Sequence, residues 1–337
     1  YGHTEMLYVD ANVCIDCGAC ADACPVKAIK PADTLVGDEL VFLDVNAEYY
    51  ENRAAPIANL EHTWDHMGPA RTGRPLRVAI VGTGPAASYA TRSLVLSTDT
   101  EVTILDRAVM SGGFVRAAVA PDHAGTKHFS STFDWIYQHP RARVYMNVTV
   151  GKDITHEELL EYHDAVIYGV GADQDRTLGV PGEDLPGVYA AHQFVRWYNA
   201  DDFAQFEGVA LEKGRAVIVG NGNVALDIAR ILLSNPADLA KTEISDAALE
   251  AIRQASIDEV VILGRRGPSF AAFTRPELLM MPSGVEVLIA SDPVTETELA
   301  EATPGSKAEL LGTLDRTHLD VGAPALTGRR AVFVYGA

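Results

Sequence analysis

The stretch Val78-Ala79-Ile80-Val81-Gly82-Thr83-Gly84-Pro85-Ala86-Ala87 decides the fold of this 337-residue chain. Its first four residues are apolar and lead into a glycine, which predicts a short strand buried on both faces. The glycine-rich turn is typical of a strand that enters a helix, which we expect over 85–96. A second apolar segment follows at 102–105. Because strand, helix and strand alternate, we expect a parallel sheet with a right-handed crossover.

Composition narrows the class of protein before any motif is considered. A length of 337 residues predicts two or three domains, and 47% hydrophobic with 22% charged residues is typical of a globular protein. A net charge of −19 argues against nucleic acid or an anionic membrane as a partner. The chain contains no apolar run long enough for a membrane span and no signal peptide at its start. We therefore expect a cytoplasmic protein.

The turn after the first strand has the features of a dinucleotide site. Gly82 permits the tight turn, and Gly84 lets the backbone approach a pyrophosphate at the helix N-terminus, which Pro85 and Ala86 begin. Asp106 ends the next strand, where an acid accepts a hydrogen bond from a ribose hydroxyl. Strand, turn, helix, strand and acid in this order are more specific than a glycine-rich turn alone.

A second unit repeats this arrangement further along the chain. Residues 216–219 predict another buried strand, and the turn after it contains Gly220, Gly222, Asn223 and Val224. Helices are expected over 223–233 and 246–255, and strands over 260–263 and 331–335. The strand over 260–263 leads into Arg265 and Arg266 rather than an acid, which favours the 2′-phosphate of NADP over NAD. The alternative is a solvated basic loop.

The cysteine run indicates an inorganic centre. Cys14, Cys17, Cys20 and Cys24 follow the bacterial spacing C-x2-C-x2-C-x3-C-P for a [4Fe–4S] cluster. Zinc is the alternative, but zinc sites usually have two separated cysteine pairs. In two-cluster ferredoxins the fourth cysteine of such a run binds the other cluster. Cys24 is therefore expected to serve a second [3Fe–4S] or [4Fe–4S] cluster, whose other ligands lie before Tyr1.

The two dinucleotide sites and the cluster together imply a flavin. A nicotinamide gives up two electrons as hydride, a cluster takes one at a time, and a flavin converts between the two. The first site is therefore expected to hold FAD and the second NADP(H).

Several segments together resemble the adrenodoxin reductase-type ferredoxin–NADP reductases. They are the two glycine-rich turns, Ala120-Pro121-Asp122-His123, Pro181-Gly182-Glu183-Asp184 and Gly264-Arg265-Arg266-Gly267-Pro268. With the cysteine run, the likeness is to the actinobacterial form that carries a fused N-terminal seven-iron ferredoxin. It implies that His123 lies near the flavin and Glu277 near the nicotinamide as catalytic residues, and that the electrons pass to a ferredoxin or another one-electron acceptor such as a cytochrome P450 system. The family's Gly-Trp-Ile-Lys-Arg-Gly-Pro-type segment is missing, so we expect a chain truncated at both ends.

The resemblance implies two Rossmann-like domains of the glutathione-reductase type behind a partial α+β ferredoxin-like module. We expect the module over 1–50, with strands at 6–9 and 41–45, a linker over 51–75, half of an FAD domain over 76–178 and an NADP domain over 179–337. The expected activity is NADPH-dependent reduction of iron–sulfur clusters through FAD. The alternatives are the small electron-input subunit of an NADPH-dependent glutamate synthase and a non-catalytic electron carrier.

Overall fold

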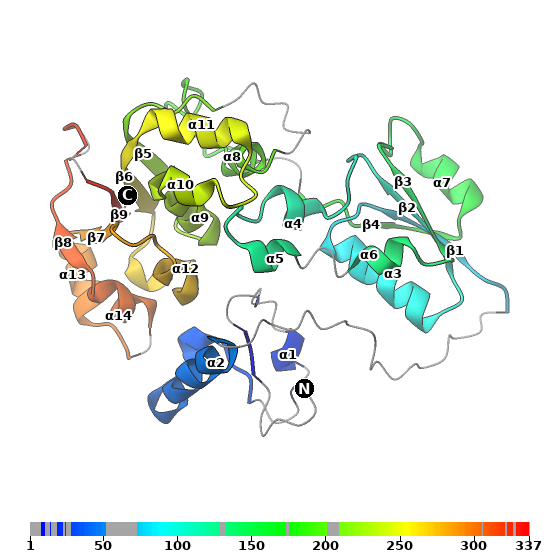
Figure 1. The fold of residues 1–337 in the computed structure, drawn as a ribbon, viewed down its shortest axis with the longest axis horizontal. Helices are drawn as coiled ribbons and strands as arrows, with labels where there is room; N and C mark the ends of the chain where they lie inside the picture. The colour runs from blue at the N-terminus through cyan, green and yellow to red at the C-terminus, as the bar shows by residue number, and fades with distance from the viewer. Residues whose placement is uncertain are drawn as a thin grey trace. The chain divides into compact units, whose positions relative to one another are not determined.

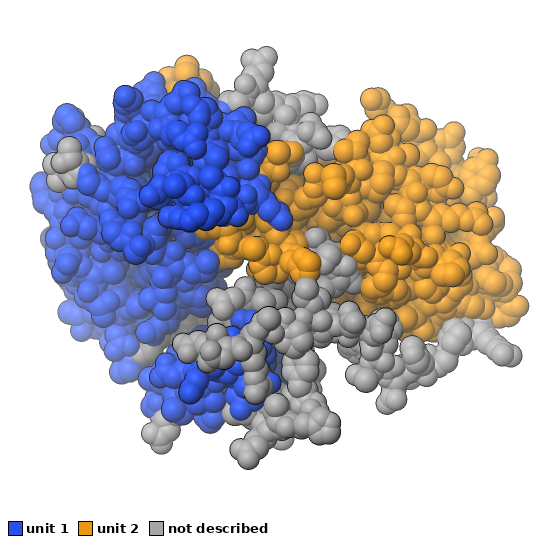
Figure 2. Space-filling model, in the orientation of Figure 1, with its two compact units in different colours: residues 1–55, 207–337 blue, residues 56–206 orange. Residues whose placement is uncertain are grey.

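The computed structural model describes residues 8–10, 14, 19–22, 24, 28–51, 73–128, 133–172, 175–200, 209–304, 306–320, 322–325 and 328–336. They belong to two compact units, residues 56–206 and residues 1–55 with 207–337, coloured separately in Figure 2. In the described residues each unit contains one parallel sheet, so the predicted α/β class is confirmed. The domain bounds predicted from the sequence stay a prediction. No helix in the described part of the chain is long and apolar enough to span a membrane.

The sheet of residues 56–206 has the strand order β3-β2-β1-β4, and all its pairs are parallel. Its strands are β1 (Arg77–Val81), β2 (Glu101–Asp106), β3 (Ala142–Met146) and β4 (Ala165–Tyr168). The predicted strands at 78–81 and 102–105 are confirmed. Since β1 lies between β2 and β4, its carboxyl end is the point where the strand order reverses, which is where open α/β sheets bind ligands.

Helices cover both faces of this sheet, which makes three layers (Figure 1). One face packs Val78 and Ile80 against α3 (Pro85–Ser97) and α6 (Asp134–Tyr137). The other packs Ala79 and Val81 against Leu159 of α7 (His156–Tyr162). The remaining helices of this unit are α4 (Gly113–Ala117), α5 (Ala124–His128) and α8 (Ala191–Tyr198). Because both faces are covered, β1 is apolar throughout rather than alternating.

The sheet of residues 207–337 has the order β5-β6-β9-β7-β8 and is also parallel. Its strands are β5 (Gly214–Val219), β6 (Ile257–Gly264), β7 (Glu286–Ala290), β8 (Asp315–Thr317) and β9 (Arg330–Tyr335). Its helices are α9 (Asn223–Leu233), α10 (Pro236–Leu239), α11 (Asp246–Ala255), η4 (Pro268–Phe270), α12 (Arg275–Leu279), α13 (Pro293–Ala300) and α14 (Lys307–Gly312). The helices predicted over 223–233 and 246–255 and the strands predicted over 260–263 and 331–335 are confirmed.

The prediction of a buried strand at 217–219 is wrong in its burial. The segment forms β5, but Val217 is 53% exposed and Val219 is 64% exposed. Among the described residues β5 pairs only with β6, so it is an edge strand rather than a central one like β1. An apolar run is compatible with either position, and the strand order decides its burial.

A buried ion cluster joins three strands of the second sheet. Glu259 on β6 is fully buried and pairs with Arg215 of β5 and Arg330 of β9. Arg215 also donates a hydrogen bond to the carbonyl oxygen of Ala323, at 3.0 Å. Two guanidinium groups compensate one desolvated carboxylate here, which is how a buried charge is tolerated. The cluster lies at the start of β5, away from the glycine-rich turn.

The N-terminal segment differs from the prediction at 41–45, where a strand was expected. These residues begin α2 (Val41–Glu51), which follows α1 (Ala19–Asp22), η1 (Ala32–Thr34) and η2 (Gly37–Leu40). The helix brings Asn46 and Tyr50 to the chain at Tyr8, since the Val9 amide donates to Asn46 Oδ1 at 2.6 Å and the Tyr50 hydroxyl to the Tyr8 carbonyl oxygen. A short apolar run does not distinguish strand from helix. Of the strand expected at 6–9, residues 6 and 7 lie outside the described residues, and residues 8 and 9 are in no regular secondary structure.

An ion pair at the start of the first sheet makes its stability depend on pH. Asp164 accepts hydrogen bonds from the Arg74 guanidinium, one of them at 3.0 Å, and from the Arg77 amide at 2.8 Å. The Arg74 bonds, and then the Arg77 bond, hold the pKa of Asp164 far below its usual value. The ionised form is therefore the one that folding favours.

We expect the stability advantage of wild type over Asp164→Asn to be constant between about pH 6 and 8 and to shrink below about pH 4. The sign follows because a lowered folded-state pKa adds stability above the unfolded-state value, and that stability disappears as Asp164 is protonated. Urea unfolding of both proteins across this range measures the advantage. An advantage that persists unchanged to pH 3 would contradict the ion-pair explanation.

Candidate functional site

The first glycine-rich turn follows β1 and admits no side chain at its first glycine. Gly82 has φ +110°, and a Cβ placed on it would lie 2.5 Å from the carbonyl oxygen of Gly169, at the end of β4. Gly169 in turn lies against Ala87, where a Cβ would come within 2.9 Å of the Ala87 Cβ. The turn, the helix after it and the end of β4 are therefore packed backbone to backbone, a contact that only glycine permits.

Asp106 holds this turn in place. The Asp106 carboxylate at the end of β2 accepts hydrogen bonds from the Thr83 amide at 2.7 Å, the Thr83 hydroxyl at 2.5 Å and the Ala108 amide at 2.8 Å. The Thr83 carbonyl oxygen accepts from the Tyr137 hydroxyl at 3.2 Å. Burial raises the pKa of Tyr137, which keeps it a donor. Asp106 lies beside the turn as the fingerprint predicts, and its contact with a ribose stays a prediction.

A second pair of glycines crosses the turn, and the sequence reasoning missed it. Gly112 immediately precedes α4 and Gly113 begins it, and both have positive φ. A Cβ on Gly113 would lie 2.6 Å from the Gly84 Cα, and the Gly112 amide donates to the Thr83 carbonyl oxygen at 3.3 Å. The adjacent glycines were the available signal, because two of them shortly after a strand indicate a close backbone approach.

The helices that begin at the two turns are open to an anion. Helix α3 starts after Gly84 and α9 after Gly222, and neither N-cap supplies a side-chain hydrogen bond. By contrast Thr155, Asn235, Ser245, Asp292 and Ser306 cap α7, α10, α11, α13 and α14 with side-chain oxygens. Amides at a helix N-terminus satisfy a pyrophosphate well. Pro85 and Ala86 occupy the first turn of α3, with Ala86 exposed, so the geometry fits a dinucleotide there.

The second turn is tied to the segment that contains Glu277. Gly220 follows β5 with φ +125°, and Val224 in the first turn of α9 is 40% exposed. The Asn221 carbonyl oxygen accepts hydrogen bonds from two amides, those of Ala272 at 3.2 Å and Phe273 at 3.0 Å. Asn223 Oδ1 accepts from the Thr274 amide at 2.7 Å. The side-chain oxygen of Asn223 is therefore used in a hydrogen bond within the protein.

The predicted arginines lie on an exposed loop at the carboxyl end of β6. Arg265 and Arg266 are both exposed, and the Arg266 guanidinium lies 4.6 Å from the centre of the Phe270 ring. An acid braces the same loop from α13. Glu298 accepts a hydrogen bond from the Ser269 amide at 3.4 Å, and a Cβ on Gly267 would lie 2.0 Å from its carboxylate. Two cations on an open loop fit a phosphate group.

The two predicted catalytic residues belong to different compact units. His123 precedes α5, and its amide donates to the Ala120 carbonyl oxygen at 3.0 Å while its carbonyl oxygen accepts from the Lys127 amide at 2.9 Å. Glu277 lies in the first turn of α12 and pairs with Arg230 of α9 at 3.0 Å. The roles of both residues stay predictions.

The cysteine loop is described in part. Cys14, Cys20 and Cys24 form no disulfide among the described residues, and Cys17 lies outside them. The Ala28 amide donates to the Cys24 sulfur at 3.3 Å. Cys14 and Cys20 are exposed, Cys20 within α1. Backbone N–H groups directed at cysteine sulfur are a feature of iron–sulfur ligation, so the Cys24 surroundings fit a cluster ligand.

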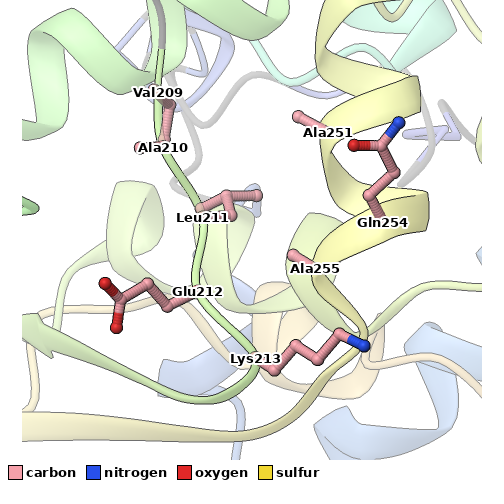
Figure 3. Close-up of a pocket in the computed structure, with 8 residues that line it drawn as sticks. All are labelled: Val209, Ala210, Leu211, Glu212, Lys213, Ala251, Gln254 and Ala255. Atoms are coloured by element: carbon pink, nitrogen blue, oxygen red, sulfur yellow. The ribbon is translucent and has the colours of Figure 1, made fainter.

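Residues 207–337 also form a surface hollow (Figure 3). It is lined by the segment that enters β5 and by the end of α11, namely Val209, Ala210, Leu211, Glu212, Lys213, Ala251, Gln254 and Ala255. The dinucleotide turns follow the carboxyl ends of their strands, whereas this hollow lies at the start of β5. None of the predicted site residues lines it.

Comparisons with known proteins match the two motif regions. Residues 76–267 match the family described as pyridine nucleotide-disulphide oxidoreductase, which covers both glycine-rich turns and the two arginines. Residues 7–30 match the 4Fe-4S binding domain, which covers the cysteine run.

Relatives extend beyond this chain. It is 41% identical over 337 residues to a probable ferredoxin/ferredoxin--NADP reductase of Mycobacterium tuberculosis (strain ATCC 25618 / H37Rv), covering 96% of this chain and 58% of that protein. It is 47% identical over 206 residues to the mitochondrial NADPH:adrenodoxin oxidoreductase of Salvelinus fontinalis, covering 61% and 41%. The solved structure of Mycobacterium tuberculosis FprA in complex with NADPH superposes with a TM-score of 0.68 at 44% identity, covering 78% and 60%. The chain thus spans less than two thirds of each of these relatives.

Proposed function

Because this chain belongs to the pyridine nucleotide-disulphide oxidoreductase family, we propose that it is part of an NADPH-dependent ferredoxin reductase. One observation carries the proposal. Two glycine-rich turns follow parallel strands in one chain, and each leads into a helix whose N-terminus has no side-chain cap. The 41% identity to a probable ferredoxin/ferredoxin--NADP reductase supports it.

The first turn is proposed to bind FAD. Gly82 and Gly84 bring the backbone close to the pyrophosphate, and Pro85 and Ala86 begin the helix that faces it. Asp106 holds Thr83 and keeps further acceptor capacity for a ribose hydroxyl. A bound FAD would supply the conversion between a two-electron hydride and single electrons.

The second turn is proposed to bind NADPH through Gly220, Gly222, Asn223 and Val224, with Arg265 and Arg266 on the 2′-phosphate. His123 and Glu277 are proposed to orient the reacting rings and to assist proton movement without covalent chemistry. The 44% identity and the TM-score of 0.68 to FprA in complex with NADPH support the nucleotide assignment.

The cysteine run is proposed to be the electron outlet. Cys14, Cys17 and Cys20 would supply three of the four ligands of a [4Fe–4S] cluster, and Cys24 would be a ligand of a second cluster. A separate ferredoxin, or another one-electron acceptor such as a cytochrome P450 system, would then receive the electrons. Thiolate ligands of this kind suit a reducing compartment such as the cytoplasm.

Turnover by the full-length protein tests this proposal against its rivals. We expect NADPH to drive the reduction of ferricyanide and cytochrome c, and NADH to do so far more slowly. A non-catalytic electron carrier would reduce neither acceptor with NADPH. A glutamate synthase subunit would instead support glutamate formation when its large subunit is added, and that result would replace the proposal.

Replacing Glu298 with Gln is expected to tighten NADP⁺ binding about threefold to tenfold. The carboxylate lies against the loop that follows Arg266, so it repels a phosphate bound there, whereas a glutamine keeps an acceptor for the Ser269 amide. Calorimetric titration of 2′,5′-ADP and 5′-AMP separates the effects, since only the first has the 2′-phosphate. Equal changes for both ligands would rule out the charge explanation.

A further inference from the structure

The core of residues 207–337 contains an arginine beside the second dinucleotide turn. Arg230 lies on α9, which begins at that turn, and is 2% exposed. An arginine is rarely buried to this extent unless its charge is paired. Its neighbours on the same face of α9 are apolar, among them Leu226 and Leu233. The cost of burying it suggests a purpose beyond packing.

Two carboxylates share this guanidinium. Arg230 Nη2 donates to Asp227 Oδ1 at 2.5 Å, and Arg230 Nη1 donates to Glu277 Oε2 at 3.0 Å. The two acids carry oxygens within 4.8 Å of each other. Carboxylates this close repel each other unless a cation lies between them. Arg230 supplies that cation and so holds the two acids together.

The segment that contains Glu277 is fixed to the turn at its other end as well. The Thr274 amide, immediately before α12, donates to Asn223 Oδ1 at 2.7 Å, and two neighbouring amides donate to the Asn221 carbonyl oxygen. Asn223 and Arg230 thus hold the start and the first turn of α12 from the same helix, α9. These two contacts tie the start of α12, and with it Glu277, to the helix that begins at the second turn.

We propose that Arg230 is a positioning residue that keeps Glu277 directed at the second dinucleotide site. The inference rests on the proposed function, because it assumes that Glu277 serves hydride transfer there. Without Arg230, repulsion between the two carboxylates turns Glu277 away from Asp227. The Arg230 variant therefore removes the same oriented carboxylate that Glu277→Gln removes.

A double-mutant cycle in the full-length holoenzyme tests this. We expect Arg230→Met and Glu277→Gln each to slow NADPH-driven flavin reduction by about tenfold to a hundredfold, and the double variant to be no slower than either. The Kd for NADP⁺ should change less than threefold in all three, since the phosphate contacts remain. A double variant slowed by the product of the two factors would overturn the proposal.

Two further variants keep the test decisive. Arg230→Lys retains the charge and should recover most of the rate; it replaces Arg230→Met in the cycle if the methionine protein does not fold. Arg253→Met breaks a solvent-exposed pair with Glu250 and should leave the rate unchanged. Unfolding of the same proteins gives a second readout, because the Arg230–Glu277 coupling should appear in their stabilities. A wild type that NADPH does not reduce would refute the proposed function, whereas additive variants of an active wild type would refute only the role of Arg230.

Discussion

Replacing Arg265 and Arg266 together with alanine should weaken NADPH binding by the full-length protein about a hundredfold or more. A hydrogen bond to a charged group contributes about 1.5–3 kcal/mol, and two such groups are removed. Both side chains are exposed on the loop after β6, so the substitution creates no cavity in the core. NADH has no 2′-phosphate, and its binding should change less than threefold.

Titration of both nucleotides into wild type and variant measures the difference directly. Arg253→Ala is the matched control, because it also removes an exposed arginine from residues 207–337. It should leave both affinities unchanged. An equal loss for NADPH and NADH would contradict the assignment of the loop to the 2′-phosphate. It would favour the alternative, a solvated basic loop.

Gly82→Ala should lower the free energy of unfolding of the unit formed by residues 56–206 by more than about 4 kcal/mol. The backbone there has φ +110°, which a side chain adopts only under strain, and the new methyl group would meet the Gly169 carbonyl oxygen at 2.5 Å. That oxygen belongs to the backbone at the end of β4 and cannot rotate away. The turn after β1 would have to move away from the end of β4.

Gly151→Ala is the control that distinguishes the backbone strain of a positive φ from the steric clash at Gly82. Gly151 has φ +92°, but no heavy atom lies within 4 Å of the position that its Cβ would take. The alanine there should cost only the conformational strain, about 1–2 kcal/mol. Denaturant unfolding followed by circular dichroism measures both variants. Similar losses at the two positions would mean that the packing of Gly82 against Gly169 adds nothing.

Two strands of the first sheet, β1 and β2, could be predicted because local signals and burial agree there. Residues 78–81 are apolar, lie at the centre of the sheet and are nearly inaccessible. At β5 the same kind of run predicts the strand correctly but not its exposure, because pairing partners far along the chain decide which strand lies at an edge. The segment at 41–45 is mostly apolar as well, but it begins a helix whose Tyr50 hydroxyl donates to the Tyr8 carbonyl oxygen.

The glycines of the candidate site could be predicted from the sequence, but the side-chain contacts that hold its loops could not. A turn needs glycine for reasons local to the backbone, so Gly82 and Gly220 can be identified from the sequence. Arg230 pairs with an acid 47 positions away, and the Thr83–Asp106 contact spans 23. No spacing rule predicts the Arg230–Glu277 pair, and the fingerprint that places Asp106 beside the turn does not predict its bonds to Thr83. The Asp106 contacts show that a residue expected to bind a ligand can also hold the loop that binds it.

Anaerobic titration of the full-length protein with NADPH tests the central proposal most directly. We expect the flavin absorbance to bleach, and the electron paramagnetic resonance signal of a reduced iron–sulfur cluster to appear afterwards in the same sample. NADH at equal concentration should produce far less of either change. A protein whose clusters are reduced by dithionite but whose flavin and clusters are untouched by NADPH would contradict the account.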